Sequence, residues 1–465
     1  MEEILKLVET DVARALKVLT AQQKPKEKLT ALRNEFREIQ RDDRETQIGK
    51  IQKDKLVKSK NVVAVRIPIP MQNKIVSTAT AFEVGAPITI NPSEENDLSE
   101  EILRLWKNNR INSVLPKLIR LQKSELQCAL LFTIKDIKPN TVFNKILGTN
   151  KNKDINIKVL ENKNGVMSPY FDSFGSMTAF VWEFSTKNSE GKEVKNAWIY
   201  TETTIYKCSN SSGTLSFDEK QVHGFGKIPV VYFSQDKQEW FNAEKMIDRL
   251  EVTISKLGAS NDYSGHPLLK LIGNVQGAPD KDEDGKAFIC DIQIDQETGK
   301  EMRSDVQFLT NDNAPESVRL EIDNLLKFIY SLTSTPDISF DNIKGLGNVT
   351  GVALKIMFLD AMIKAQMNNE ELNRPSIERI INVFIAGNVT STNTKYKSIS
   401  ESTYFDVQFN SIIPDDLNTT VETLTKAVES GITSQKTAVE ILGLTDSNSD
   451  ELEQIQSEKE TVVVE

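Results

Sequence analysis

Histidine and cysteine are scarce in this sequence, and their scarcity excludes several kinds of site. His223 and His266 are the only histidines, which leaves too little imidazole for a histidine-rich zinc site or for most imidazole-based acid–base mechanisms. Cys128, Cys208 and Cys290 lie far apart, and this sparse, odd set suits packing in a reducing compartment better than a disulfide framework. A Ser-His-Asp set, a paired-cysteine cluster and a His-Glu-x-x-His motif are also missing, so we predict that the protein is not an enzyme.

Long apolar runs and an excess of positive charge are missing as well. No run approaches the ~18 apolar residues that a membrane helix needs, so we expect no membrane association. The 465 residues contain 57 Lys and Arg against 67 Asp and Glu, a net charge of −10, so bulk charge does not hold a polyanionic partner. The 38% of hydrophobic and 27% of charged residues are typical of a globular protein. The length predicts about two to four structural units.

The spacing of apolar residues changes along the first half of the chain. Residues 1–60 show helical spacing and high charge, which predicts a helical arm or packing layer. A second helix is expected from about residue 71 to Gly85, and a helix pair over 98–106 and 114–131. Residues 155–233 consist of short β-rich runs separated by Asn, Ser and Gly clusters, which predicts a mainly antiparallel β region.

Two later helices, expected over 236–258 and 313–333, carry apolar seams with alternating spacings of three and four. Such seams are typical of helices packed along their length. A slender hairpin cannot bury both seams by itself, so we expect them to pack against neighbouring copies of the chain. The seam residues are Trp240, Ile247, Leu250 and Ile254 on the first helix and Ile322, Leu325 and Ile329 on the second.

The opposite face of the first helix is basic. Lys245, Arg249 and Lys256 lie about half a turn from the seam at ~100° per residue. On one isolated helix this pattern indicates an ordinary solvated face. If several copies surround an axis, the same residues form rings of positive charge, and we take them as candidates to face such an axis.

Residues 259–312, between these helices, are rich in Gly, Asp and short strands, expected near 268–272, 287–294 and 306–309. They predict a small β module on a two-helix stalk. Within it, Asp280, Asp282, Asp284, Gly285 and Asp291 have the spacing of a calcium loop. Proline and β-like sequence replace the flanking helices, and Asp-Gly is a strong hairpin signal, so we favour an exposed turn without a metal, with calcium as the alternative.

A loop with two glycines follows the second helix, over residues 341–349. Its glycine spacing is one residue too long for the dinucleotide fingerprint, and no Lys-Ser/Thr follows for a Walker A loop, so we expect no nucleotide cofactor. The apolar periodicity that would bury this run is missing, and we expect a mobile loop that contacts a partner. The contact candidates are Asp341, Asn342, Lys344, Gly345, Gly347 and Asn348.

Beyond the loop, a long helix is expected from Thr350, kinked or ended at Arg374-Pro375. A strand pair is expected around 395–408. Short helices are expected over 417–429, 436–442 and 451–458, before an acidic tail.

This order of helix, β insertion, return helix, glycine-bearing loop and kinked helix resembles the portal proteins of tailed double-stranded DNA bacteriophages. The resemblance covers about residues 60 to 460 and leaves the first 60 unmatched. The segments that resemble the family locally are 73–85 (NKIVSTATAFEVG), 224–231 (GFGKIPVV), 261–268 (NDYSGHPL), 335–338 (TPDI) and 350–355 (TGVALK).

The resemblance implies an α+β portal fold assembled as a closed ring of about twelve subunits around a DNA channel. Loop 341–349 corresponds to the tunnel loop that narrows this channel. The implied regions are an N-terminal arm (1–60), a wing (61–235 and 334–414), a stem (236–258 and 313–333), a β-rich clip (259–312) and a helical crown with an acidic tail (415–465).

The resemblance also implies the partners. They are double-stranded DNA bound without sequence preference, the terminase large subunit, the major capsid and scaffold proteins, and a head–tail adaptor. The expected location is one vertex of the virion capsid, after assembly in the host cytoplasm. Weak contact with the DNA backbone suits transport, because a channel that gripped phosphates strongly would stall it. The alternatives are another virion structural or scaffold protein without a channel, and a nucleotide- or calcium-dependent enzyme.

Overall fold

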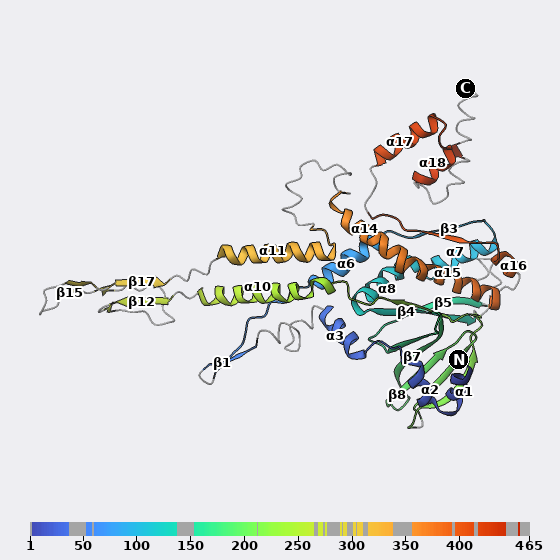
Figure 1. Ribbon diagram of the computed structural model, residues 1–465, viewed down its shortest axis with the longest axis horizontal. Helices are drawn as coiled ribbons and strands as arrows, with labels where there is room; N and C mark the ends of the chain where they lie inside the picture. The colour runs from blue at the N-terminus through green and yellow to red at the C-terminus, as the bar shows by residue number, and fades with distance from the viewer. Residues whose placement is uncertain are drawn as a thin grey trace.

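A slender stalk of two helices, tipped with short strands, extends from a mixed body of helices and sheets (Figure 1). The fold class is α+β, as predicted. The computed structural model of the chain describes residues 2–36, 53–57, 60–136, 153–211, 213–264, 268–272, 275–276, 289–290, 292–294, 301–303, 305–309, 315–337, 356–392, 396–412, 417–442 and 454–455.

The predicted N-terminal helices are present, and they form a packing layer. The helices are α1 (Glu2–Thr10), α2 (Val12–Leu19) and α3 (Lys26–Phe36). Helices α1 and α2 cover one face of a sheet, where Val8 and Leu19 are buried in a cluster with Ile199. Helix α3 lies elsewhere, with its apolar side in the core at the base of the stalk.

Residues 155–233 form antiparallel β-sheet, as their composition predicts. Five strands pair in the order β10-β9-β8-β7-β6, and three pair in the order β11-β4-β5. Aromatic residues pair across the larger sheet, where Trp182 lies opposite Trp198. The bounds are β4 (Gln127–Asp136), β5 (Lys153–Leu160), β6 (Val166–Phe171), β7 (Met177–Lys187), β8 (Glu193–Tyr200), β9 (Thr204–Ser209), β10 (Ser216–Val222) and β11 (Val230–Ser234).

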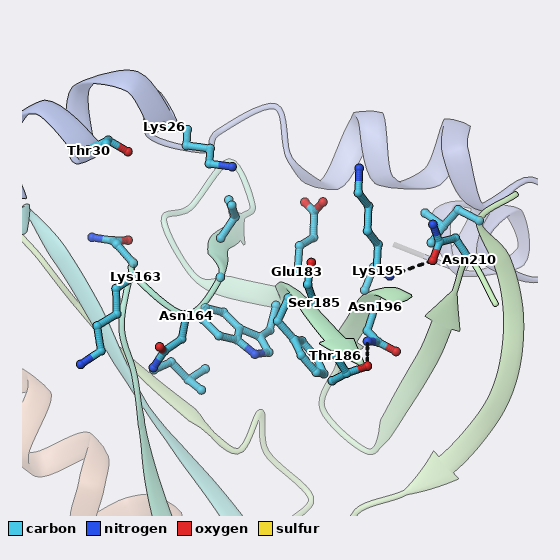
Figure 2. Close-up of a pocket in the computed structure, with 18 of the residues that line it drawn as sticks. Lys26, Thr30, Lys163, Asn164, Glu183, Ser185, Thr186, Lys195, Asn196 and Asn210 are labelled. Carbon is cyan, nitrogen blue, oxygen red and sulfur yellow. Dashed lines mark hydrogen bonds between the residues drawn. The ribbon is translucent and has the colours of Figure 1, made fainter. Parts of the chain in front are cut away.

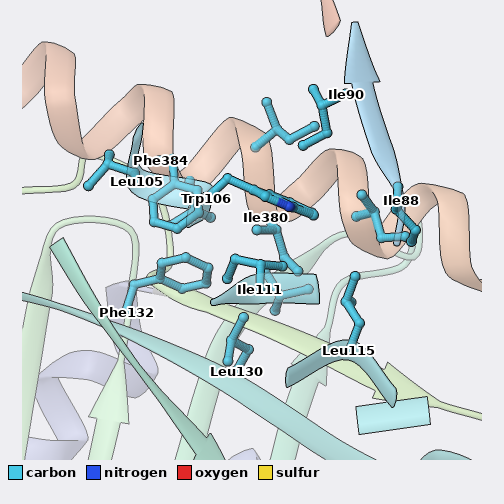
Figure 3. Close-up of a cluster of buried hydrophobic side chains, with 14 of the residues drawn as sticks. Ile88, Ile90, Leu105, Trp106, Ile111, Leu115, Leu130, Phe132, Ile380 and Phe384 are labelled. Atoms are coloured by element: carbon cyan, nitrogen blue, oxygen red, sulfur yellow. The ribbon is translucent and has the colours of Figure 1, made fainter. Parts of the chain in front are cut away.

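The largest apolar core lies between the three-stranded sheet and a helical layer (Figure 3). Phe132 from β4 meets Phe384 edge to face, with ring centroids 5.2 Å apart. Asn96 and Ser99 form a capping box that begins the helix α7. The helices of this layer are α6 (Met71–Val84), α7 (Asp97–Asn108), α8 (Ile111–Glu125) and α15 (Arg374–Gly387).

The helix predicted over 114–131 is too long. Helix α8 ends at Glu125, because Leu126 adopts the left-handed conformation with φ 63°, and β4 follows directly. Residues Cys128–Phe132 are buried throughout. A short, fully apolar run does not distinguish a buried strand from a helix by periodicity alone, which explains the error.

The stalk matches its predicted order. Helix α10 (Glu244–Ser264) leads to β12 (Leu268–Ile272), which pairs antiparallel with β17 (Asp305–Leu309) before α11 (Pro315–Thr333) returns to the body. Shorter described strands at the tip are β13 (Val275–Gln276), β14 (Ile289–Cys290), β15 (Ile292–Ile294) and β16 (Glu301–Arg303). The calcium-like spacing of 280–291 lies outside the described residues, except Cys290 and its neighbour in β14.

The long helix expected from Thr350 is interrupted near Pro375, and its expected start, 350–355, lies outside the described residues. Helix α14 (Leu359–Asn368) passes into the π-helix η2 (Asn369–Asn373) and then into α15, whose first turn holds Pro375. A second π-turn, η3 (Asn388–Thr392), and α16 (Tyr396–Ser400) follow.

Within the described residues 396–412, where a strand pair is expected, β18 (Phe405–Gln408) is the only strand. Its partner is β3 (Thr89–Pro92), from far earlier in the sequence. Sequence reasoning sought the partner locally, and α16 occupies that place. The predicted helices α17 (Leu417–Glu429) and α18 (Gln435–Leu442) are present. A strand pair also joins β1 (Lys55–Val57) to β2 (Lys60–Val62). Among the described helices, none combines the length and the apolar character that crossing a membrane requires.

Candidate functional site

The base of the stalk buries the seam of α10 inside the chain. Trp240, Ile247 and Leu250 are fully buried in one cluster with residues of α3, α6 and α11. Trp240 stacks on Phe36 and donates its indole N–H to Glu35 at 2.8 Å. Ile247 and Leu250 lie on one side of α10, as the alternating spacing of three and four predicts. Trp240, which we expected on the same helix, lies before the 3-10 turn η1 (Phe241–Ala243), and α10 begins only at Glu244.

The premise that the two seams need neighbouring copies for their burial is therefore wrong. Ile329 of α11 is also fully buried in this cluster, and Ile254, Ile322 and Leu325 are partly buried against it. Helices α3 and α6 supply the cover that a bare hairpin lacks. A subunit-interface role for the seven seam residues is still a prediction, and their burial within one chain gives it no support.

The basic face of α10 is exposed but largely paired. Arg249 binds Glu321 of α11, with Nη2 and Oε1 2.7 Å apart, and Lys245 lies 3.7 Å from Asp248 on its own helix. Lys256 is exposed and has no ion-pair partner within the described part of the chain. Two of the three expected cations are thus paired with acidic side chains, one on the same helix and one on α11.

The glycine-bearing loop, with all its candidate residues from Asp341 to Asn348, lies outside the described residues. Helices on both sides of it are described. Helix α11 ends at Thr333, and Lys364 of α14 donates to the Thr333 carbonyl at 2.8 Å. The hydroxyl of Thr333 also hydrogen bonds with that of Thr335 at 2.9 Å. Residues 338–340 and 350–355, which flank the loop directly, also lie outside the described residues, so these contacts join the end of α11 to α14.

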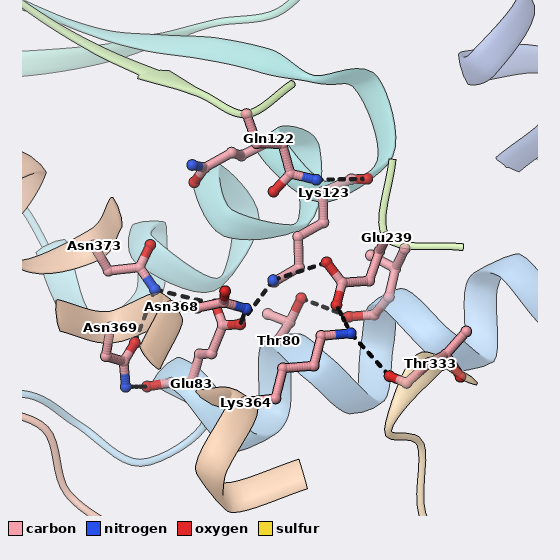
Figure 4. Close-up of polar contacts among 12 residues, drawn as sticks. Thr80, Glu83, Gln122, Lys123, Glu239, Thr333, Lys364, Asn368, Asn369 and Asn373 are labelled. Atoms are coloured by element: carbon pink, nitrogen blue, oxygen red, sulfur yellow. Dashed lines mark hydrogen bonds and ion pairs between the residues drawn. The ribbon is translucent and has the colours of Figure 1, made fainter. Parts of the chain in front are cut away.

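Lys364 belongs to a buried network of charged side chains (Figure 4). Lys123 of α8, only 2% exposed, lies 2.7 Å from a Glu83 oxygen of α6 and 3.1 Å from a Glu239 oxygen. Lys364 reaches the other oxygen of Glu239 at 2.6 Å. Two ammonium groups thus balance two carboxylates, as burial requires.

Three asparagines around the π-turn complete the network. Asn368 and Asn373 donate to the two Glu83 side-chain oxygens at 2.6 and 3.0 Å, and Asn369 donates to the Glu83 carbonyl at 3.1 Å. A π-turn leaves the regular hydrogen-bond register of a helix, and amide contacts to one buried carboxylate fix it in place. The network joins α6, α8, the segment before α10, and α14.

The network shifts the pKa values of its members in opposite directions. Burial would lower the pKa of the Lys123 ammonium, but Glu83 and Glu239 outweigh burial and raise it above the ordinary value. Burial would raise the pKa of Glu239, but Lys123 and Lys364 hold it below the ordinary value. Both groups are therefore charged at neutral pH, and the chain's own residues are their partners.

The described cysteine and histidine side chains, Cys128, Cys208 and His223, contribute to packing, whereas His266 and the side chain of Cys290 lie outside the described part of the chain. Cys128 and Cys208 are buried and unpaired with each other, as predicted. His223 bonds the Thr201 carbonyl through Nε2 at 3.0 Å, and burial lowers its pKa. Within the described ranges, no group of His, Cys, Asp or Glu could hold a metal ion.

Comparisons with known proteins were made for the whole chain. A family model described as "Phage portal protein, SPP1 Gp6-like" matches residues 26–464. No curated protein matches the sequence. Three solved structures align with TM-scores below 0.5. They are the neck of an empty GTA particle computed with C6 symmetry (11% identity, TM-score 0.44, covering 95% of this chain and 100% of that chain), the neck of a native GTA particle computed with C12 symmetry (10%, 0.41, 94% and 99%), and the virion of a native gene transfer agent particle (10%, 0.40, 91% and 95%).

Proposed function

The chain belongs to the phage portal protein family, SPP1 Gp6-like, and from this membership we propose that about twelve copies close into a ring around an axial channel for double-stranded DNA. The family is structural and non-enzymatic, in agreement with the prediction from the sequence. In this proposal the ring is a virion component at one capsid vertex, where DNA is packaged, retained and ejected. Terminase, an adaptor, and the capsid and scaffold proteins are its proposed partners.

The observation that carries the ring is an exposed apolar row on α11. The side chains of Leu320, Phe328 and Leu332 are 62%, 57% and 44% exposed, because no other described part of the chain covers this side of α11. Helix α14 carries a second row at i, i+4 spacing, with Leu359, Ile363 and Met367 about half exposed. Exposed apolar side chains that recur on two helices are typical of an interaction site, and in the proposed ring a neighbouring copy covers them.

We propose the same wing, stem, clip and crown regions that the resemblance to portal proteins implies. The proposed stem, 236–258 and 313–333, contains most of α10 and all of α11, although α10 begins later than expected, at Glu244, and continues to Ser264. The proposed clip, 259–312, presents a docking surface to the packaging motor, and the proposed crown begins near residue 415. The wing comprises 61–235 and 334–414, and the first 60 residues add a packing layer to it. The clip assignment is tested by deleting residues 277–286, which should spare the fold of the body and abolish DNA packaging.

DNA contact is proposed for the loop 341–349 and for Lys256 of the stem, an exposed cation with no ion-pair partner among the described residues. The support for the loop is its sequence, in which Gly345 and Gly347 permit large backbone changes and Lys344 supplies a cation. One lysine per subunit becomes a ring of about twelve charges through symmetry. Such contacts touch phosphates without reading bases.

Ring formation is tested with a matched pair of phenylalanine variants. Phe328→Asp places a charge in the apolar row of α11 and should abolish the ring. The unsubstituted chain should form a species of about 630 kDa, the mass of twelve chains of 52.3 kDa. Phe174→Asp makes the same change at a 93% exposed turn away from the stalk and should leave the species intact. Equal assembly of both variants in native mass spectrometry would exclude α11 as the contact.

The DNA role is tested with Lys344→Glu in a packaging assay. Repulsion between the new carboxylates and phosphate should slow or arrest packaging, while the ring still forms. The control is Lys192→Glu on the exposed turn between β7 and β8. Normal packaging by the Lys344 variant would remove the loop from the DNA path.

A further inference from the structure

A cleft of about 1040 Å³ lies between α3 and the two sheets (Figure 2). Helix α3 lines one side through Lys26, Thr30 and Arg33. The last three residues of β5 and the turn before β6 line another. Strands β7 and β8 contribute Glu183 and Lys195, which project from the sheet toward the helical layer in Figure 2.

The described lining of this cleft is strongly basic in a chain of net charge −10. It holds five cations, Lys26, Arg33, Lys158, Lys163 and Lys195, and Glu183 is its one carboxylate. Lys163 is paired with Glu161 at 2.7 Å. The other four cations have no ion-pair partner in the part of the chain that the structure describes, so the cleft is suited to an anionic ligand.

Arg33 adds a specific signal. Its Nε atom is buried and has no hydrogen-bond partner among the described residues. An unsatisfied buried donor costs ~1–3 kcal/mol, and more when the group is charged. Arg33 also lines the cleft, so a carboxylate that enters it can bind the planar guanidinium, although Nε itself is enclosed by the chain.

The cleft also runs along unpaired strand edges. Strand β5 is the edge strand of the β11-β4-β5 sheet, and β6 is the edge strand of the larger sheet. Residues 158–160 of β5 and Val166 of β6 line the cleft. An exposed edge strand offers backbone N–H and C=O groups to an extended peptide, which can add as another strand.

These features favour a peptide over a nucleic acid. Binding of single-stranded nucleic acid relies on aromatic rings that are open to stacking bases. The aromatic rings beside this cleft pack on one another instead. Trp182 is buried and stacks on Phe184, with centroids 6.1 Å apart, and Phe184 packs edge to face on Trp198.

We propose that this cleft binds an extended acidic segment of another protein, which adds to the edge of β5 and places its carboxylates on Arg33, Lys158 and Lys195. This inference goes beyond the proposed portal function and requires neither the ring nor DNA.

The experiment uses the full chain and a fluorescein-labelled peptide of about ten alternating Glu and Thr residues, a length that matches one strand. Fluorescence anisotropy should show saturable binding that weakens as salt is raised. Lys158→Glu combined with Lys195→Glu should weaken binding about tenfold or more, since each replaces an attraction by a repulsion. Arg33→Gln should weaken it several-fold. Lys192→Glu, on the same β7–β8 hairpin but outside the cleft, should not change it.

Three results would overturn the proposal. One is unchanged binding in the Lys158 and Lys195 double variant, whose side chains are exposed and whose folding is checked by thermal unfolding. Another is equal binding of a peptide in which Lys replaces Glu. The third is a single-stranded oligothymidine that binds more tightly than the acidic peptide and displaces it. Methylating alternate backbone nitrogens of the peptide should abolish binding, and unchanged affinity would exclude strand addition.

Discussion

The two helices of the stalk differ in how one chain satisfies their apolar sides. Helix α10 buries Ile247 and Leu250, together with Trp240 from the segment before it, in a core completed by α3 and α6. Helix α11 contributes Ile329 to that core and leaves Leu320 and Phe328 exposed. The spacing of apolar residues alone does not predict whether the apolar side of a helix is buried within its own chain or left exposed. The difference depends on which distant elements reach each helix.

The largest effect is expected at Ile247. Ile247→Asp buries an unpaired charge in the α10 core and should lower the free energy of unfolding by about 4–5 kcal/mol or more, enough to prevent folding. Thermal and urea unfolding of the variant would measure the loss. Phe328→Asp should leave the stability of the isolated chain within about 0.5 kcal/mol. The reverse ranking would refute the comparison between the two helices.

The buried network at the base of the stalk gives the next largest effect. Lys123→Met keeps the volume but leaves Glu83 and Glu239 facing each other without the ammonium between them. Removing one member of a buried ion pair costs about 3–5 kcal/mol, which urea unfolding would report. The control is Lys192→Met, at an exposed turn. If the two variants were equally stable, the apolar contacts of α10 would suffice to hold the stalk base.

The stalk and the apolar side of α10 could be predicted from the sequence, because both depend on local periodicity. The same holds for most of the helices and for the β-rich region. The network could not be predicted, since its members come from four segments that only the tertiary fold brings together. A weak signal exists in the sequence. Glu83 and Lys123 occupy positions on the buried sides of amphipathic helices, where a charge requires a partner. The partner of β18 and the end of α8 at Leu126 were equally out of reach, because both depend on contacts outside the local sequence.

The pH dependence of stability should show the same network. The pKa of Glu239 is lowered in the folded chain, so its contribution is present above the unfolded value near 4.5 and is lost as the pH falls through the folded value. The pKa of Lys123 is raised, so its contribution is complete below about 10.5 and is lost as the pH rises through the folded value. Stability should therefore have a plateau between about pH 5 and 10. In Lys123→Met the alkaline decline should be smaller, and an identical alkaline decline would assign it to other groups.

The smallest effect is expected on the exposed face of α10, where Arg249 joins the two helices through Glu321. Arg249 is about half exposed, so solvent screens this pair and its contribution is about 0.2–1 kcal/mol. Arg249→Gln should lower the free energy of unfolding by that amount at low salt and by less at high salt. Lys256→Gln removes a cation that has no ion-pair partner among the described residues and should leave the stability unchanged. A double-mutant cycle with Glu321→Gln isolates the Arg249 pair. A coupling energy of about 3 kcal/mol or more would mean that the outer face of the stalk is as tightly built as its base, and the contrast between the two helices would fail there.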